Sequence, residues 1–443
     1  MPATAPSEAA IRDPVETAPR DELRSLQLRR LQTTVERILA SQAPGAERLA
    51  AAGIEEAGEF RSLEDLARLP FSQKSDLREH YPFGLLAVPR EEVVRIHASS
   101  GTHGKPTVVA YTRADLENWA ELMARCMTMA GVRPGMVVHN ANGYGLFTGG
   151  LGFHMGAERI GATVVPVSGG FTARQAMLLE DLGGEVLVST PSYALVIATA
   201  LRDAGADPSR LHLELGLFGG EPWTESMRAE IERKLGLRAI NNYGLSEMCG
   251  PGVAAECPHQ DGLHVQEDHF LAEVVDPDSG EPLAEGDAGE LVFTSLSKEA
   301  LPLIRYRTGD IGSLTTKRCE CGRTTARLGD LRGRIDDMLI IRGVNLYPSE
   351  VERILLSVGD VAPHYQLIVE RPAQMDELTV LCEPASAVVD RPALGTSLER
   401  LFRERTGIRI AVEVVEAGSI PRSEGKAVRV VDRRRQDKSG GTR

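Results

Sequence analysis

The chain has 443 residues, of which 42% are hydrophobic and 26% are charged, a composition typical of a globular protein with a buried core. It is too long for one ordinary domain, and its length predicts about two or three. The formal net charge of −13 at pH 7 argues against nucleic-acid and membrane-surface partners, because both require a basic surface. Neither an apolar run of about eighteen residues nor an N-terminal apolar signal segment is visible, so we expect a cytoplasmic protein.

The first part of the chain changes from a polar leader to helices and then to alternating strands and helices. Residues 1–20 are rich in Ala, Pro and Glu and are expected to be disordered. Residues 21–87 are predicted to be helical, and Ser62 with Asp65 forms a capping-box pattern. After His97, apolar strands alternate with helices. This alternation predicts an α/β fold with parallel strands covered on both faces.

The later part of the chain has a different pattern. Between about residues 262 and 314, short strands and turns predict an antiparallel, barrel-like module. Near Gly333 the composition changes again, and a mixture of strands and helices follows. We therefore expect a large domain over residues 21–334 and a small α+β domain over residues 335–443.

The segment "SSGTHGKPT" (residues 99–107) combines small residues, hydroxyl groups and a lysine between two predicted strands. Backbone N–H groups in a glycine-rich turn can converge on phosphate oxygens, and the hydroxyls and the lysine add donors. The spacing is not that of a Walker loop. Taken alone, the segment is either a phosphate-binding loop or a polar hairpin.

Other motifs follow in an order that decides the interpretation. Each motif by itself is weak evidence of a functional site, because an aspartate at a strand end or a lysine in a turn is commonly just solvated. Together they resemble the adenylate-forming superfamily, and most closely its phenylacetate–CoA ligase family, from about residue 25 to residue 432. The segments that carry this resemblance, besides residues 99–107, are "GYGLFTGGLG" (143–152), "FGGEPWTE" (218–225), "NNYGLSE" (241–247), "YRTGDIG" (306–312), "GRIDDMLIIRGVNLYPSEVE" (333–352) and "IPRSEGKAVR" (420–429).

The resemblance implies a two-step ligase whose small C-terminal domain is mobile. A carboxylate attacks the α-phosphate of Mg·ATP to give an acyl-adenylate and pyrophosphate, and the thiol of CoA then displaces AMP. Cations and N–H donors must stabilise the transferring phosphoryl group. An aryl-acid:CoA ligase is the leading hypothesis. Two alternatives stay open: an adenylation enzyme that loads the phosphopantetheine of a carrier protein, and a nucleotide-binding protein that has lost catalysis.

The same resemblance assigns roles to individual residues. Ser246 would face the α-phosphate, and Glu247 would hold Mg²⁺, which prefers hard oxygen ligands. Asp310 would accept the ribose hydroxyls, Arg334 would contact ribose or phosphate, and Lys426 would bridge the carboxylate and the α-phosphate. The β- and γ-phosphates would be held by Ser99, Ser100, Gly101, Thr102, Gly104 and Lys105. The adenine site would be formed by Gly219, Gly220, Glu221, Pro222, Tyr243 and Gly244.

Two further positions match the moving parts of the family. Asp336 occupies the position of the hinge about which the small domain rotates, and a hinge needs a few residues that absorb a large dihedral change. Gly343 would border the tunnel of the pantetheine arm, where a side chain would block passage. An ordinary turn is the alternative for both. Homodimers are frequent among relatives, but the sequence carries no interface signature.

The chain also departs from its relatives. His103 stands where a second Thr or Ser is usual, Asn142 replaces an aromatic residue of phenylacetate ligases, and Phe171 replaces a polar one. The Asn142 amide would hydrogen-bond the acid, and the Phe171 ring would make the pocket narrower or more apolar. We take these changes as favouring a ring-substituted aromatic acid of the hydroxy- or amino-benzoate type rather than plain phenylacetate, unless both side chains face away from the substrate. The other residues expected to line the pocket are Tyr144, Gly145, Phe147 and Pro251.

Four residues with sulfur or imidazole ligands predict a structural zinc site. "CECG" places Cys319 and Cys321 on one tight turn, and "ECPHQDGLH" supplies Cys257 and His264. Thiolates with an imidazole in a tetrahedral set are what structural zinc prefers. His259 is the alternative to His264. We expect the ion to clamp the antiparallel module rather than to catalyse.

Overall fold

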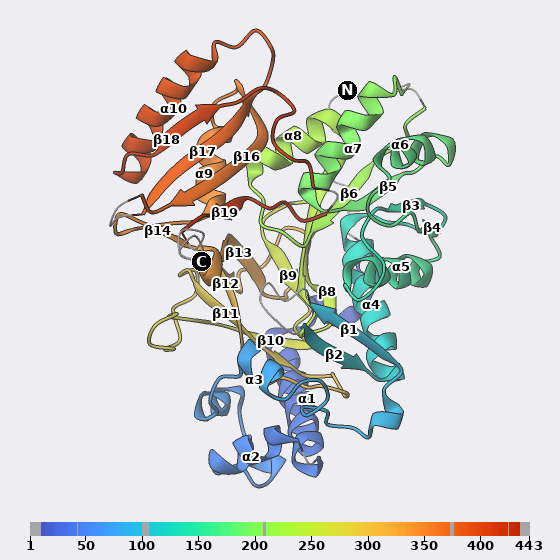
Figure 1. Ribbon diagram of the computed structural model, residues 1–443. Helices are drawn as coiled ribbons and strands as arrows, with labels where there is room; N and C mark the ends of the chain where they lie inside the picture. The colour runs from blue at the N-terminus through green and yellow to red at the C-terminus, as the bar shows by residue number, and fades with distance from the viewer. Residues whose placement is uncertain are drawn as a thin grey trace, which may run out of the picture.

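The computed structural model describes residues 10–41, 43–99, 106–206, 210–372, 376–423 and 425–434. A large part built on an 11-stranded sheet carries a smaller C-terminal part at one end (Figure 1). No helix in these described ranges is both long enough and apolar enough to cross a membrane.

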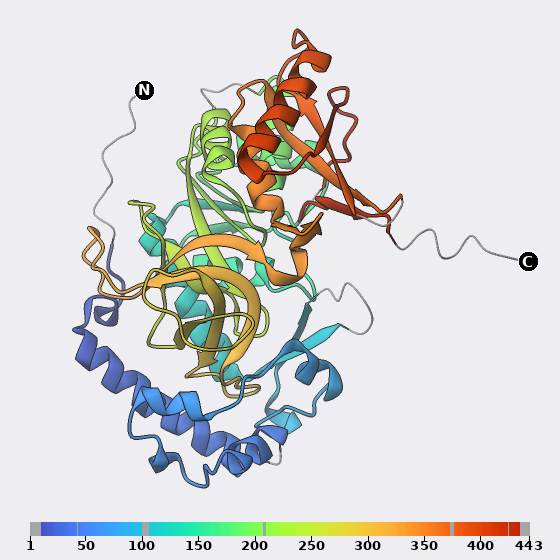
Figure 2. The ribbon, with the colours of Figure 1, turned by 90° about the vertical axis from the view of Figure 1, so that its left-hand side faces the viewer.

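Helices form the N-terminal part of the chain, and they lie below the sheet in Figure 2. In the longest of them, Leu31, Val35 and Ile38 recur at helical spacing and bury one apolar face, which packs against Phe60. The helices and 3₁₀ turns of this part are η1 (Pro14–Thr17), α1 (Arg20–Ala40), α2 (Pro44–Ala51), η2 (Ala57–Glu59), η3 (Leu63–Arg68), α3 (Lys74–Glu79) and η4 (Arg90–Glu92).

Residues 10–20 differ from the disorder expected from their composition. Asp13 caps η1 by accepting a hydrogen bond from the Val15 N–H, and Glu16 is 3% exposed. The Glu16 carboxylate accepts a 2.7 Å hydrogen bond from Arg323, a fully buried arginine far along the chain. A buried arginine requires a carboxylate partner, and this long-range pair is why the segment is ordered.

The parallel half of the sheet has the strand order β7-β6-β5-β3-β4 and is covered on both faces. Helices α4 and α5 bury one face, and α6, α7 and α8 bury the other. These strands are therefore apolar on both sides, as parallel strands usually are. Their bounds are β3 (Val137–Asn140), β4 (Thr163–Val165), β5 (Val186–Ser189), β6 (Leu215–Gly219) and β7 (Arg238–Leu245); those of the helices are α4 (Arg113–Ala130), α5 (Gly149–Ile160), α6 (Thr172–Asp181), α7 (Pro191–Asp203) and α8 (Glu225–Leu235).

The antiparallel half continues the same sheet in the order β7-β8-β9-β13-β12-β11-β10. The sequence predicts a separate antiparallel module, but the pairing of β7 with β8 joins both halves into one sheet. Figure 2 shows how strongly β12 and β13 curve. The bounds are β8 (Gly250–Glu256), β9 (Leu263–Val265), β10 (Phe270–Val275), β11 (Gly289–Ser295), β12 (Tyr306–Thr315) and β13 (Arg327–Arg334).

A hairpin and a small α+β unit complete the fold. Strands β1 (Arg95–Ser99) and β2 (Thr107–Tyr111) pair antiparallel with Ser99 opposite Thr107. After β13 the chain forms a four-stranded sheet of order β18-β17-β16-β19 with its own hydrophobic core. The elements of this small unit are η5 (Ile335–Asp337), β14 (Leu339–Ile341), β15 (Val344–Leu346), α9 (Pro348–Leu356), β16 (Val361–Glu370), β17 (Glu377–Pro384), α10 (Arg391–Thr406), β18 (Ala411–Val414) and β19 (Val430–Asp432).

Candidate active site

The carboxyl ends of the parallel strands and the start of the small unit meet at one place, where most of the predicted site residues lie. At its centre the Tyr243 hydroxyl donates a 2.6 Å hydrogen bond to Asp310 Oδ2, and Arg334 Nη1 lies 3.4 Å from Oδ1. Burial raises the pKa of the Asp310 carboxyl, although the Arg334 guanidinium opposes the shift. The Asp310 carboxylate, on β12, thus links Tyr243 of β7 to Arg334 of β13.

Glu221, in the turn after β6, does something that the sequence did not indicate. Its Oε1 accepts a 2.7 Å hydrogen bond from the Ser192 N–H at the start of α7, and its Oε2 accepts a 2.8 Å bond from the Ala427 N–H of the small unit. Both oxygens are therefore engaged with backbone N–H groups. Residues 219–222 were expected to contact the adenine base. Because the Glu221 carboxylate is already engaged, only the backbone of this turn is available for such contacts.

The loop that carries Lys426 lies against that turn. The Lys426 Cε atom is 3.6 Å from the position that a Cβ of Gly220 would occupy, and Gly220 has φ +84°. The Thr190 hydroxyl donates a 3.0 Å hydrogen bond to the Gly425 carbonyl, and this bond fixes the loop. The Lys426 ammonium lies 5.2 Å from the centre of the Phe147 ring. Loss of surrounding water lowers the pKa of Lys426, although Glu221 opposes the shift.

Ser246 and Glu247 lie in the tight turn that follows β7, and both are buried. The Ser246 hydroxyl is 3.3 Å from that of Thr148, at the start of α5. Behind the turn, Lys298 donates a 3.3 Å hydrogen bond to the Glu247 carbonyl and lies 4.6 Å from the centre of the Tyr111 ring. Lys298 is 6% exposed, so it supports the turn from the protein side. In the sequence, the one sign of this role of Lys298 is that a lysine stands within the largely apolar segment before β12.

Four of the six residues expected to contact the acid, Asn142, Tyr144, Gly145 and Phe147, lie in the segment between β3 and α5. The Tyr144 hydroxyl accepts a 2.8 Å hydrogen bond from Asn140 Nδ2, and burial raises the pKa of Tyr144 to about 12. The Asn142 N–H donates to Asn140 Oδ1 at 3.2 Å. Pro251 packs on the same side, where its carbonyl accepts a 2.8 Å bond from Trp119 of α4.

The other pocket predictions fare differently. Gly145 has φ +141°, a backbone conformation that favours glycine. Phe147 lies next to the Lys426 ammonium. Phe171 is 68% exposed and its ring lies 5.1 Å from the Arg174 guanidinium carbon, so the ring faces solvent.

Asn242 is a polar residue that the sequence analysis overlooked. It is 5% exposed, and neither atom of its side-chain amide has a hydrogen-bond partner in the part of the chain that the structure describes. Side chains alternate along β7, and Ile240 packs with α4 and α5 whereas Ala239 packs with α7 and α8. Asn242 therefore faces the α4 and α5 side, as Tyr144 and Pro251 do.

The predicted phosphate loop connects β1 to β2. Ser100, Gly101, Thr102, Gly104 and Lys105 lie outside the described residues, as does His103. The Ser99 hydroxyl is buried at the end of β1 and has no hydrogen-bond partner among the described residues.

The hinge and tunnel positions lie in exposed turns. Asp336 is in η5, and its carboxylate accepts a 2.8 Å hydrogen bond from Arg334 Nε. Gly343 joins β14 to β15 with φ +82°, and open space surrounds the position that a Cβ would occupy there. A side chain at Gly343 would strain the backbone and point into this space.

The four residues of the predicted zinc site converge. One ligand atom from each of Cys257, His264, Cys319 and Cys321 lies within 4.8 Å of the others. The sulfurs of Cys257 and Cys319 lie 3.7 Å apart, and Cys321 Sγ lies 3.4 Å from His264 Nε2. A donor set of three thiols and one imidazole fits zinc.

The surroundings of this cluster separate the two candidate histidines. His264 Nδ1 lies 3.1 Å from the Thr325 hydroxyl, which orients the ring. His259 instead lies 3.5 Å from the exposed Glu320 carboxylate. The described cluster therefore contains His264 and not His259.

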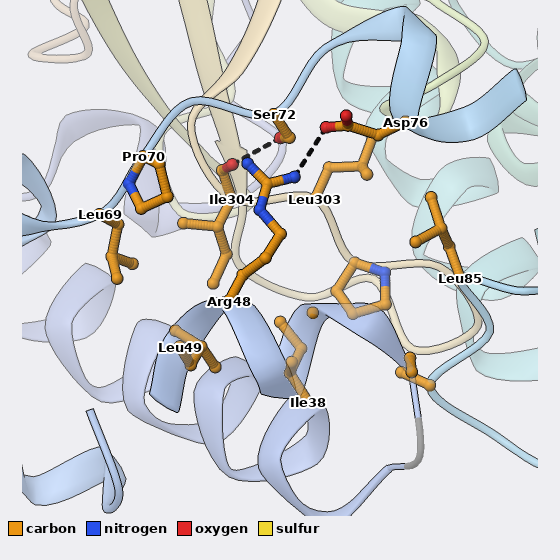
Figure 3. Close-up of a pocket in the computed structure, with 14 residues that line it drawn as sticks. Ile38, Arg48, Leu49, Leu69, Pro70, Ser72, Asp76, Leu85, Leu303 and Ile304 are labelled. Carbon is orange, nitrogen blue, oxygen red and sulfur yellow. Dashed lines mark hydrogen bonds and ion pairs between the residues drawn. The ribbon is translucent and has the colours of Figure 1, made fainter. Parts of the chain in front are cut away.

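A separate pocket lies between the N-terminal helices and the loop that precedes β12. Figure 3 shows the Arg48 guanidinium reaching Asp76, at 2.7 Å, and the Ser72 hydroxyl donating to the Ile304 carbonyl. Arg48 and Asp76 are the charged residues of its lining, and they neutralise each other. The pocket shares no residue with the candidate active site.

Comparisons with known proteins show the family of the chain. Residues 23–297 match the family model "AMP-binding enzyme", and residues 343–434 match "AMP-binding enzyme C-terminal domain". A phenylacetate-coenzyme A ligase of Thermus thermophilus is 52% identical over 441 residues, which cover 95% of this chain and 99% of that protein.

Two crystal structures of one enzyme, 2-hydroxyisobutyryl-CoA ligase, differ in their likeness to this chain. The structure in the postadenylation state, with 2-HIB-AMP, has a TM-score of 0.90 and 31% identity. The structure in the thioesterification state, with 2-HIB-AMP and CoA, has a TM-score of 0.71 and 32% identity. Each alignment covers 98% of this chain and 96% of the other. The present arrangement of the two parts is therefore more similar to that of the postadenylation-state structure than to that of the thioesterification-state structure.

The fold is that of an adenylate-forming enzyme. The chain belongs to the AMP-binding enzyme family and, within it, to the phenylacetate–coenzyme A ligases. It is accordingly an AMP-forming acid–CoA ligase.

Proposed function

We propose that the chain activates an arylacetic or closely related aromatic acid with ATP and transfers the acyl group to CoA. One observation carries the proposal: Lys426 of the small unit lies against the turn at Gly220, beside the Asp310 carboxylate held by Tyr243. The full-length likeness to phenylacetate-coenzyme A ligases supports the choice of acid.

In the first step a carboxylate oxygen of the acid bonds to the α-phosphorus of ATP, and the bond to pyrophosphate breaks. Lys426 would neutralise the two anions as they approach, and Ser246 would donate to the α-phosphate. Asp310 would accept the ribose hydroxyls. Residues 99–105 would hold the β- and γ-phosphates. In the second step the CoA sulfur bonds to the acyl carbon, and the bond to AMP breaks.

Glu247 would hold Mg²⁺. Its carboxylate is buried beside the Tyr306 hydroxyl, and a carboxylate oxygen is a hard ligand of the kind Mg²⁺ prefers. When bound, the ion would neutralise phosphate charge. Lys298, which holds the Glu247 backbone from behind, would keep this turn in place.

The acid would carry a hydrogen-bonding ring substituent. The buried amide of Asn242 lacks partners among the described residues, and an unpaired buried amide costs about 1–3 kcal/mol. A hydroxyl or amino group on the substrate would satisfy it. Asn142, beside Tyr144, would add a second amide to the pocket. The solvent-facing ring of Phe171 gives no support to a narrower pocket.

CoA is the proposed thiol acceptor, and Gly343 would border its path. The postadenylation-like arrangement favours an enzyme that changes its domain orientation between steps, with Asp336 as the hinge. A carrier protein would use the same tunnel, so this second candidate acceptor is tested alongside CoA. We place the reaction in the cytoplasm, where ATP and CoA are supplied together.

We further propose that Cys257, His264, Cys319 and Cys321 hold one structural zinc ion. Their convergence within 4.8 Å supports the proposal, and the ion would tie β9 to the turn between β12 and β13. Zinc bound there would stabilise the antiparallel half without joining the reaction.

The testing experiment is acid-dependent ATP–pyrophosphate exchange over phenylacetate, hydroxyphenylacetates, benzoates, anthranilate and short fatty acids. Thioester formation is then compared with CoA and with a phosphopantetheinylated carrier protein. We expect exchange with an aromatic acid and a thioester with CoA. Exchange with none of these acids would refute the proposed function.

A further inference from the structure

The carboxylate of Glu352, in α9, is buried where the small unit contacts the large one. It is 2% exposed. Its Oε1 accepts a 2.9 Å hydrogen bond from the Thr224 hydroxyl and lies 3.3 Å from the Thr224 N–H. Thr224 is the residue that caps α8, so the carboxylate lies at a helix N-terminus, where negative charge is stabilised.

The other Glu352 oxygen has partners in its own unit. The Tyr365 hydroxyl donates to Oε2 at 3.2 Å, and Arg429 Nη2 lies 3.6 Å away. Arg429 lies over the Tyr365 ring at 4.3 Å and donates a 3.2 Å bond to the Ser192 hydroxyl of α7. The pair Glu352 and Arg429 therefore contacts two helices of the large unit, and Figure 1 shows the small unit beside both.

This contact is specific to one orientation of the small unit. A carboxylate inside a protein is stable only with its partners in place, and removing one partner is costly. Leu356, at the end of α9, packs on the apolar core between α7 and α8 and excludes water nearby. If the small unit rotates, Thr224 and Ser192 stay behind on the large unit, and Glu352 loses its partners there.

The same contact determines where Lys426 lies. Arg429 follows Lys426 by three residues, and the Ala427 N–H between them is bound to Glu221. Arg429 is held against α7, and α9 is held against α8. These two contacts anchor the Lys426 loop on the side that follows Lys426 in the chain. The higher TM-score to the postadenylation structure than to the thioesterification structure assigns this contact to the adenylation side of the cycle.

We propose that Glu352, with Arg429, is a positioning residue that holds the small unit in the adenylation orientation, and that its bond to Thr224 breaks before thioester formation. The proposal rests on the proposed function. Glu352 touches neither nucleotide nor acid in this assignment; it acts through the position of Lys426.

The test measures the two half-reactions separately in Glu352→Gln, with Glu350→Gln on the same helix as the matched control. Because neutralising a buried, paired charge weakens its contact, we expect acid-dependent ATP–pyrophosphate exchange to fall about tenfold. Thioester formation from supplied acyl-adenylate and CoA should stay within about twofold of wild type. The control should match wild type in both.

Thr224→Val removes the hydroxyl partner, and Thr224→Ser keeps it together with the helix cap. We expect the first to reproduce the selective loss and the second to restore exchange. The Glu352→Gln/Thr224→Val double variant should be no worse than Glu352→Gln alone. Hydrogen exchange of the Thr224 amide should be faster in Glu352→Gln.

Two results would overturn the proposal: an equal loss of both half-reactions, which indicates a purely structural role, or no loss of exchange in Glu352→Gln. Failure of the proposed function is recognised differently, since the wild-type enzyme itself would then show no exchange with any acid. The Thr224 amide measurement tests the contact in either case.

Discussion

Tyr243 and Asp310 share a 2.6 Å hydrogen bond although 67 residues separate them in the chain. The bond stabilises the ionised carboxylate, which burial disfavours. If Asp310 accepts the ribose hydroxyls as proposed, this bond would lower the pH at which its carboxylate becomes charged and able to do so.

Tyr243→Phe should move the acid limb of kcat/KM for ATP to higher pH. The folded pKa of Asp310 is already raised, so its charge is lost at a higher pH than that of an ordinary aspartate. Removing the tyrosine hydroxyl raises this pKa further. We expect a loss of about threefold to tenfold on the acid limb and a smaller one on the plateau at higher pH. Asp310→Asn, which cannot ionise, should abolish this limb and bind ATP weakly at every pH; an unshifted limb in Tyr243→Phe would contradict the assignment.

Lys426→Ala should lower the adenylation rate by a factor of about 100 or more, since an ammonium group that faces the reacting phosphoryl group is lost. ATP binding and thioester formation from preformed adenylate should be retained. Because the pKa of Lys426 is lowered, wild-type adenylation should also decline at a pH below the usual lysine range. Lys426→Arg, which keeps its charge, should lack this alkaline decline. Equal losses in adenylation and thioester formation would contradict the assignment of Lys426 to the adenylation step.

Asn242→Leu should change the ranking of acids without large loss of stability, because leucine has a similar volume and needs no partner. We expect kcat/KM for 4-hydroxyphenylacetate to fall about tenfold relative to phenylacetate. Asn142→Ala should alter the ranking as well. Phe171→Ala is the control, since its ring faces solvent. A ranking that stays the same in both asparagine variants would place the amides outside the pocket.

Protein purified without chelator should contain about one zinc per chain, as a single tetrahedral site requires. Cys319→Ser should abolish the metal content and lower the Tm by several degrees. His259→Ala should keep both, because His259 pairs with Glu320 instead. Metal-free wild-type protein with an unchanged Tm would refute the zinc site.

Local sequence patterns predicted much of this fold. Alternating apolar strands and capped helices located the parallel sheet, and "GRIDDMLII" marked the start of the small unit. The features that were missed depend on partners far apart in sequence. Disorder was predicted for residues 1–20 because they are rich in Ala, Pro and Glu, whereas Arg323, 307 residues beyond Glu16, holds the described part of this segment in place.

The site shows the same limit. The motifs identified Tyr243, Asp310 and Lys426, and the structure brings them together. The sequence analysis did not single out Glu352, because its partner Thr224 lies 128 residues away. Asn242 stands one residue before Tyr243, and only the alternation of side chains in the folded β7 shows which layer it faces.

Glu221 gives one oxygen to the large unit and the other to the loop that carries Lys426. Any change that the nucleotide imposes on this turn is therefore felt by the loop, and the reverse holds by thermodynamic reciprocity. If nucleotide binds at this turn as proposed, its occupancy and the present position of the Lys426 loop would be coupled through Glu221, so departure of AMP should change how firmly the loop is held.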